Sequence, residues 1–272
     1  MGQSLDVFAL YLALGVVAGV IAGLFGLGGG AIIVPVLIIA FTVSGYAPEL
    51  LTHLAIGTSL ATIVVTSTSA IATHHQKDAV RWPLVVSMIP GIVIGAAVGG
   101  LLAAQLDGPL LQICFGVFLI FIAGQMVFSA PVSGHRELPG LGSRSGVAGV
   151  IGCLSGIFGI GGGSLTVPFL SWCRIPMPQA VASSAALGFP IAVSATLVYV
   201  MTGWSAAGLP AGAYGYVYLP AFIGIALTSI PFAQVGAKLA HRLPETGLRF
   251  AFAGLSLLLG LIFIVSNIGL VM

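Results

Sequence analysis

The chain has 272 residues, of which 58% are hydrophobic and 5% carry a charged side chain. Soluble domains contain about 25% charged residues, so this composition excludes an ordinary soluble protein. The formal net charge is +2 and the basic residues are dispersed, which gives no indication of nucleic-acid binding. Apolar runs of about 20 residues, enough to cross a hydrocarbon core about 30 Å thick, recur from end to end. They predict an all-α integral membrane protein.

Five apolar segments are expected in each half of the chain. In the first half they cover about residues 5–24, 31–45, 52–73, 83–104 and 110–130. In the second half they cover about residues 145–160, 164–175, 180–202, 213–238 and 246–270. The first segment lacks a basic region before it and a clear cleavage site, so it is expected to be a retained span. The chain is therefore divided into a first transmembrane repeat (1–130), a polar, turn-rich cytoplasmic linker (131–144) and a second transmembrane repeat (145–272).

A glycine-rich motif occurs once in each half and shows that the halves are an internal repeat. It reads Gly23-Leu-Phe-Gly-Leu-Gly-Gly-Gly-Ala-Ile-Ile-Val-Pro-Val-Leu37 in the first half and Gly156-Ile-Phe-Gly-Ile-Gly-Gly-Gly-Ser-Leu-Thr-Val-Pro-Phe-Leu170 in the second. Further on, Ala55-Ile-Gly-Thr-Ser59 corresponds to Ala180-Val-Ala-Ser-Ser184. Val80-Arg-Trp-Pro83 likewise corresponds to Val217-Tyr-Leu-Pro220.

The distribution of basic residues predicts that the two repeats are inverted. Lys77 and Arg81 place the connection between the third and fourth segments in the cytoplasm by the positive-inside rule. Alternating from there puts all eight Lys and Arg residues inside and both chain ends outside. The first repeat then begins outside and the second begins inside, as in many secondary transporters.

The segment after each glycine motif is too short to span a bilayer comfortably, at about 1.5 Å of rise per residue. Each glycine run is therefore expected within the membrane, where it opens a helix whose free N–H groups and positive dipole end suit an anion. The predicted substrate-binding backbone comprises Gly28, Gly29, Gly30 and Ala31 in the first half and Gly161, Gly162, Gly163 and Ser164 in the second. The alternatives are that the glycines only permit close helix packing, or that they form a dinucleotide-binding fingerprint. The second half lacks the acidic residue that such a fingerprint needs.

Hydroxyl side chains in the third segment of each half are further candidates for substrate binding. They are Thr58, Ser59, Ser183 and Ser184, which donate hydrogen bonds to an oxyanion without burying a charge. The alternative is that they bond back to their own helices or join neighbouring helices. His53, near the outer end of the same segment, is the candidate for proton coupling because histidine changes charge near neutral pH.

The sequence contains no recognisable cofactor or metal site. Cys114, Cys153 and Cys173 lie in apolar segments without a CxxC spacing, which is typical of buried small hydrophobes. No GxxxxGK[ST] motif is present to bind ATP, and no cluster of His, Asp and Glu suggests an enzyme.

The duplicated motif G-[LI]-F-G-[LI]-G-G-G-x-[LI]-x-V-P, followed by A-[IV]-[GA]-[ST]-S, resembles the TauE/SafE family of sulfite and organosulfur anion exporters. The runs Gly26–Gly30 and Gly159–Gly163 match the family motif, and Ser183 stands where threonine is expected. The resemblance implies an inner-membrane secondary transporter that exports sulfite or an organosulfonate such as sulfoacetate, driven by a proton or anion gradient. A passive anion channel and a transporter of a small carboxylate are the alternatives. The oligomeric state does not follow from the sequence.

Overall fold

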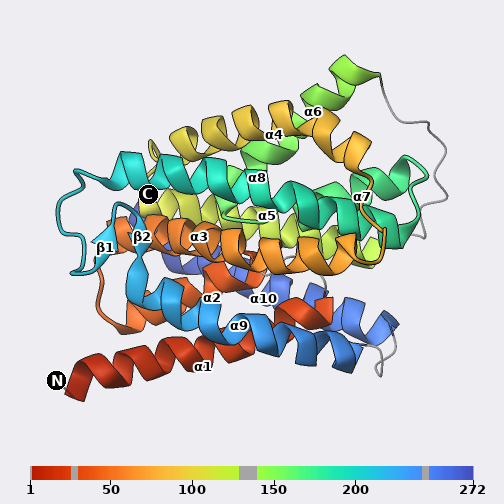
Figure 1. Cartoon of the computed structure of the whole chain (residues 1–272). Coiled ribbons are helices and arrows are strands. Elements are labelled where there is room, and N and C mark those ends of the chain that lie inside the picture. The colour runs from red at the N-terminus through yellow and green to blue at the C-terminus, as the bar shows by residue number, and fades with distance from the viewer. Residues whose placement is uncertain (1, 26–29, 129–139, 241–244, 272) are drawn as a thin grey trace.

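The structure, a computed structural model, describes residues 2–25, 30–128, 140–240 and 245–271 (Figure 1). Within these ranges the chain is almost entirely helical, and the only strands form one two-stranded hairpin. The elements are α1 (Gly2–Phe25), α2 (Gly30–Val43), α3 (Pro48–His75), α4 (Trp82–Ala103), α5 (Gly108–Phe128), α6 (Leu141–Phe158), α7 (Gly163–Trp172), α8 (Met177–Gly203), β1 (Ala213–Tyr214), β2 (Val217–Tyr218), α9 (Leu219–Ala240) and α10 (Glu245–Val271).

The fold is that of an all-α membrane protein, as the composition predicts. In the described part of the chain, six helices are long and apolar enough to cross a membrane: α3, α4, α5, α6, α8 and residues Phe250–Gly269 of α10. The helices α2 and α7 have only 14 and 10 residues. At about 1.5 Å per residue they rise about 21 and 15 Å, which confirms that the segments after the glycine motifs are short.

Several expected boundaries differ from the structure by a few residues, and two of these differences change the description of the fold. The fourth segment of the second half was expected to begin at residue 213, but residues 213–218 form the β1–β2 hairpin and α9 begins at Leu219. Gly212 and Gly215 adopt positive φ angles of 91° and 56°, which reverse the chain on either side of β1. Helix α6 begins at Leu141, so the last four residues of the expected linker are helical.

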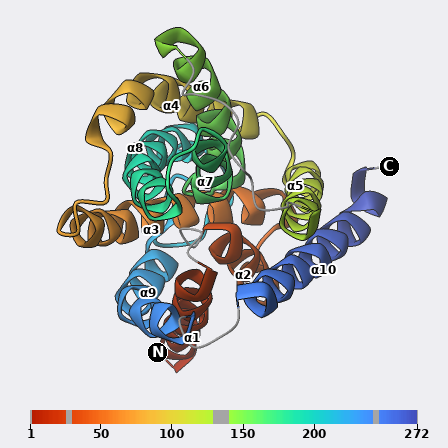
Figure 2. The same cartoon turned by 90° about the vertical axis from the view of Figure 1, so that its right-hand side faces the viewer.

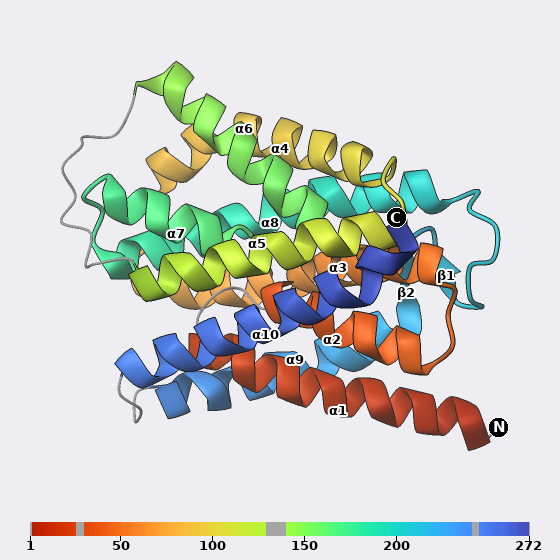
Figure 3. The ribbon, with the colours of Figure 1, turned by 180° about the vertical axis from the view of Figure 1, so that it is seen from behind.

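Three helix pairs surround a central group of helices. The pairs are α1 with α9, α4 with α6, and α5 with α10. The end-on view places them around α3, α8, α2 and α7, and the view from behind shows α5 and α10 on the same face (Figures 2 and 3). Helix α3 is the most buried of the six candidate spans, and its residues from Leu51 to Ile63 are all shielded from solvent.

The two ends of the bundle differ in the connections that they carry. Both chain termini, the hairpin and the α2–α3 connection lie at one end, which we call the terminal end (Figure 1). The α3–α4 connection with Lys77 and Arg81, the α7–α8 connection with Arg174, and the start of α6 with Arg144 lie at the other, which we call the basic end. The α1–α2 pair therefore enters the bundle from the terminal end and the α6–α7 pair from the basic end.

Glycine allows α4 and α6 to touch through their backbones. A Cβ atom built on Gly95 would lie 2.9 Å from Gly149 Cα and would overlap the Gly149 carbonyl oxygen. Because backbone atoms cannot rotate away, we expect Gly95→Ala to lower the stability of the protein by about 1–3 kcal/mol, in the range of overpacked cores.

The control for this prediction is Gly124→Ala on α5, where nothing lies within 4 Å of the added methyl group. Alanine there should stabilise the helix by about 0.5–1 kcal/mol through reduced backbone entropy. Thermal unfolding of the two purified variants measures the difference. A Gly95→Ala protein as stable as Gly124→Ala would contradict the backbone contact between α4 and α6.

Candidate functional site

The second glycine run forms a buried turn between two short helices. Helix α6 ends at Phe158 and α7 begins at Gly163, and we call residues 159–162 between them the α6–α7 turn. Gly159 and Gly162 have φ angles of 68° and 75°. In this left-handed region a side chain costs about 1–2 kcal/mol, so the turn selects glycine at both positions.

The start of α7 offers unpaired backbone donors inside the protein. All residues from Gly159 to Ser164 are buried. The amides of Leu165 and Thr166 donate to the carbonyl oxygen of Gly162 at 3.1 and 2.7 Å. The structure gives the amides of residues 161–164 no backbone acceptor in the described ranges. Free N–H groups and the positive end of the helix dipole make this a suitable environment for an anion.

The two glycine motifs meet in the centre of the fold. A Cβ atom built on Gly30, the first residue of α2, would lie 2.6 Å from the Gly159 carbonyl oxygen and 2.8 Å from Ile160 Cα. Ala31 follows in α2 and is buried. The candidates Gly28 and Gly29 lie outside the described residues. Ser59 of α3 donates a hydrogen bond of 3.1 Å to the Gly159 carbonyl oxygen, so it supports the α6–α7 turn from the other side.

Helix α8 covers a third side of the α6–α7 turn. A Cβ atom built on Gly188 would lie 2.8 Å from the carbonyl oxygen of Gly161. Ser184 lies one helical turn before Gly188, on the same face of α8. Its side chain is 2% exposed, and its hydroxyl has no hydrogen-bond partner among the described residues. Of the four hydroxyls expected from the sequence, Ser59 and Ser184 are therefore the two that lie near the α6–α7 turn.

The other two predicted hydroxyls hold backbone groups of the opposite half. Thr58 Oγ1 accepts a hydrogen bond of 3.0 Å from the Tyr218 amide, next to the start of α9. Ser183 Oγ accepts one of 3.1 Å from the Arg81 amide, next to the start of α4. These bonds join α3 to the start of α9 and α8 to the start of α4, and no hydrogen bond among the described residues joins either hydroxyl to the α6–α7 turn. Substrate binding by either residue stays a prediction.

Two hydroxyls that sequence reasoning missed lie directly at the α6–α7 turn. A Cβ atom built on Gly162 would lie 3.4 Å from Thr166 Oγ1 and 3.8 Å from Ser155 Oγ. Both side chains are 0% exposed and neither hydroxyl has a partner among the described residues; the same is true of the Ser164 hydroxyl, whose side chain is 3% exposed. Ser155 and Thr166 flank the glycine run, and comparing them with the first repeat would have drawn attention to them.

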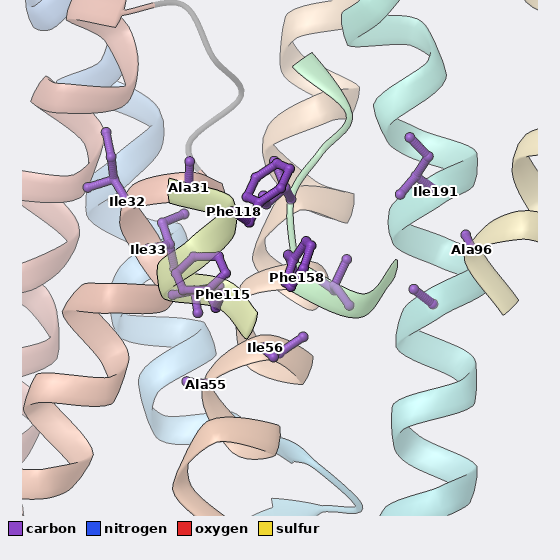
Figure 4. Packing of buried hydrophobic residues seen from close by; sticks show 14 of the residues in the cluster. Ala31, Ile32, Ile33, Ala55, Ile56, Ala96, Phe115, Phe118, Phe158 and Ile191 are labelled. Carbon is purple, nitrogen blue, oxygen red and sulfur yellow. The ribbon is translucent and has the colours of Figure 1, made fainter. Parts of the chain in front are cut away.

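The side of the α6–α7 turn that faces α2 and α5 is apolar. The ring of Phe158 stacks on that of Phe118 with centroids 4.6 Å apart, and it lies 5.8 Å from the ring of Phe115. Figure 4 shows these three rings gathered beside Ala31 and Ile33 of α2. The described residues contain no group of three or more His, Cys, Asp and Glu side chains that could hold a metal. The donors identified at the turn are backbone amides and hydroxyls, which are neutral.

His53 lies away from the α6–α7 turn, near the terminal end of α3. Its Nε2 is 3.0 Å from the Ala103 carbonyl oxygen and its Nδ1 is 3.3 Å from that of Glu49. The ring packs 5.0 Å from that of Tyr216 in the hairpin. Burial raises the pKa of the Tyr216 phenol, so this neighbour is neutral at pH 7. A neutral imidazole donates through one nitrogen only, whereas a protonated ring can donate to both carbonyls.

Comparison with known proteins gives a consistent picture. Residues 11–263 match the family described as sulfite exporter TauE/SafE. A probable membrane transporter protein of Haemophilus influenzae is 35% identical over 90% of this chain and 93% of its own length. Similar proteins, also named probable membrane transporters, occur in Methanocaldococcus jannaschii (28% identical, 93% of both chains) and Bacillus subtilis (30% identical, 72% of this chain and 79% of the relative). No solved structure matches the chain.

Proposed function

Because this chain belongs to the TauE/SafE sulfite exporter family of membrane transporters, we propose that it exports a small sulfur-containing oxyanion by alternating access. The cargo class is sulfite or an organosulfonate such as sulfoacetate. The observation that carries the proposal is the α6–α7 turn, where buried left-handed glycines leave the amides at the start of α7 without backbone acceptors. A site of neutral donors binds an anion modestly and releases it readily, which suits transport.

The alternating-access part of the proposal requires two inverted repeats, and equivalent contacts support them. The bond from the Tyr218 amide to Thr58 has its counterpart in the bond from the Arg81 amide to Ser183. In the alignment of the two halves, Tyr218 corresponds to Arg81 and Thr58 corresponds to Ser183. Helices α5 and α10 contact each other reciprocally, since a Cβ atom on Gly116 or Gly260 would lie 2.7 Å from the other's carbonyl oxygen. Such reciprocity is expected where a two-fold axis passes between equivalent helices.

Alternation would then exchange access between the two ends of the bundle. The α1–α2 and α6–α7 pairs enter from opposite ends, and their glycine motifs touch at Gly30 and Gly159. A rocking motion of one repeat against the other would open the shared centre first to one side and then to the other. The positive-inside rule assigns the basic end to the cytoplasm and both termini to the periplasm of an inner membrane. His53 is the proposed proton-coupling residue.

The test is the thermal stability of the purified full-length protein in the presence of single anions. The panel is sulfite, sulfate, thiosulfate, sulfoacetate, taurine and acetate. A ligand that binds only the folded state raises the melting temperature. At a ligand concentration of 100 times its Kd, it adds about 2.7 kcal/mol to the stability of the protein. We expect sulfite or sulfoacetate to raise it most. If acetate alone raised the melting temperature, the substrate would be a carboxylate and not a sulfur oxyanion.

Counterflow in proteoliposomes separates a transporter from a channel. Vesicles loaded with unlabelled sulfite or sulfoacetate should accumulate the labelled anion transiently and saturably. Flux that only follows the electrochemical gradient, without saturation or counterflow, would contradict alternating access and identify a passive channel.

A further inference from the structure

Three hydroxyls around the start of α7 are buried without a hydrogen-bond partner in the described part of the chain. They belong to Ser155, Ser164 and Thr166, whose side chains are 0%, 3% and 0% exposed. A buried hydroxyl without a partner is unfavourable, because its hydrogen bonds to water are lost on folding and not replaced. Such groups are exceptional in a folded protein, and each requires an explanation such as a functional role or a bound ion.

Two of the three hydroxyls lie close to the same atom position, and the third belongs to the first turn of α7. Ser155 Oγ and Thr166 Oγ1 lie 3.8 and 3.4 Å from the position of a Cβ atom on Gly162. Ser164 is the second residue of α7, at its amino-terminal end. The hydroxyls therefore come from both helices that the α6–α7 turn connects. Ser155 and Thr166 approach Gly162, next to the first amides of α7, and Ser164 belongs to the first turn of that helix.

The ordinary explanation of buried serine and threonine in helices does not apply to α7. Such hydroxyls usually donate to a carbonyl oxygen three or four residues earlier in their own helix. Thr62 does so with a 2.9 Å bond to the Thr58 carbonyl, and Thr202 with a 2.8 Å bond to that of Val198. Ser164 and Thr166 make no such bond.

The first repeat has apolar residues at the corresponding positions. In the register of the glycine motif, Ser155, Ser164 and Thr166 correspond to Ala22, Ala31 and Ile33. Ala31 and Ile33 are 3% and 2% exposed, and they lie beside the rings of Phe115, Phe118 and Phe158 (Figure 4). The start of α2 is thus packed against apolar groups, whereas the end of α6 and the start of α7 carry three hydroxyls without a partner among the described residues.

From this difference we infer that the oxyanion site is one-sided, and that Ser155, Ser164 and Thr166 of the second repeat are among the residues that donate side-chain hydrogen bonds to the anion. The first repeat closes the site with apolar surface and donates no side-chain hydrogen bond from α2. The inference rests on the proposed function, since it assigns residues to that same anion site. Three hydroxyls together with the first amides of α7 suit a head group with three oxygens, as in sulfite or a sulfonate.

The experiment measures the Kd of sulfite and of sulfoacetate for the full-length protein by thermal shift. The variants are Ser155→Ala and Thr166→Val, which remove a hydroxyl at nearly constant volume. We expect each to weaken anion binding about tenfold or more, the usual effect of losing a hydrogen bond to a charged group. The melting temperature without anion should stay the same or rise, because the hydroxyl removed has no partner.

Ser229→Ala is the matched control. Ser229 is 4% exposed, and its hydroxyl also lacks a partner among the described residues, but it lies on α9 against Gly19 of α1. This variant should bind the anions as the parent protein does. On the first repeat, Ile33→Val should also leave the Kd unchanged, since α2 is inferred to donate no hydrogen bond.

The outcomes separate this inference from the proposed function. Anion binding that is normal in Ser155→Ala and Thr166→Val would overturn the one-sided site and leave the proposed transporter standing. A parent protein that no sulfur oxyanion stabilises would overturn both. Weaker binding of both sulfite and sulfoacetate supports a site for the shared three-oxygen head group. Weaker binding of sulfite alone supports the one-sided site with inorganic sulfite as the cargo.

Discussion

Replacing Gly162 by alanine is expected to abolish anion transport, because the added methyl group occupies the point on which the site converges. It would lie 2.5 Å from Ile191 Cδ1 and 3.4 Å from Thr166 Oγ1. The φ angle of 75° adds a strain of about 1–2 kcal/mol. The flexible Ile191 side chain can move aside, so the protein should still fold. The methyl group and the displaced Ile191 side chain then crowd the hydroxyls of Ser155 and Thr166, and transport should fall to background.

Gly208→Ala is the control that separates the effect of the methyl group at Gly162 on the site from the effect of backbone strain. Gly208 has a similar φ angle of 80°, but its added methyl group would meet only Leu50 Cδ1, at 3.5 Å. Both variants should therefore lose a similar amount of stability, about 1–2 kcal/mol. Only Gly162→Ala should lose transport in proteoliposomes, measured at equal amounts of reconstituted protein. Equal transport rates for the two variants would show that the α6–α7 turn is not at the site.

Thr58→Val and Ser184→Ala are expected to have opposite effects, although both remove a buried hydroxyl on a central helix. Thr58 accepts a hydrogen bond from the Tyr218 amide, so valine leaves a buried N–H group unsatisfied. We expect Thr58→Val to lower the stability by about 1–3 kcal/mol. The Ser184 hydroxyl has no partner among the described residues. Ser184→Ala should therefore leave the stability unchanged or raise it, while weakening transport about tenfold, the cost of a hydrogen bond to an anion.

Melting temperatures and initial transport rates, measured on the same preparations, test this pair of substitutions. Transport per folded molecule should be close to normal in Thr58→Val, since its hydroxyl is assigned to the backbone of the hairpin. A Ser184→Ala protein that transports normally would remove Ser184 from the proposed site. A Thr58→Val protein with normal stability would contradict the role of the bond to Tyr218.

Much of the fold could be predicted from the sequence because membrane helices are governed by local properties. Hydrophobic length and glycine or proline punctuation indicated every helical segment, including the short α2 and α7. The hairpin at residues 213–218 was missed, since its tyrosine, valine and alanine residues are as apolar as a span. The positive φ angles of Gly212 and Gly215 turn the chain into a hairpin. The pattern of apolar residues gives no information about these angles.

The sequence indicated the glycine turn but not the hydrogen-bond partners of the hydroxyls near it, and this difference has one cause. The glycine run of the second repeat was identified correctly as an interruption between two helices, since three adjacent glycines disfavour a continuous helix. Four hydroxyls on α3 and α8 were proposed with it, but Ser59 donates to the α6–α7 turn and Thr58 and Ser183 accept from distant amides. Ser155 and Thr166 were not proposed, because nothing local distinguishes them from serine or threonine bonded to its own helix.

The sequence by itself determined the class of protein, the positions of the helices and the two glycine motifs. These follow from the length of the apolar segments and from the conformational freedom of glycine. Both are local properties of the sequence. Only the tertiary structure decided which polar groups are satisfied. A hydroxyl's partner depends on which distant backbone group comes within hydrogen-bond distance: the Tyr218 amide binds Thr58, whereas no described group hydrogen-bonds to the Thr166 hydroxyl. The groups free to bind a ligand are the hydroxyls and amides that have no partner in the folded protein. They can be identified only once the packing of the helices is known.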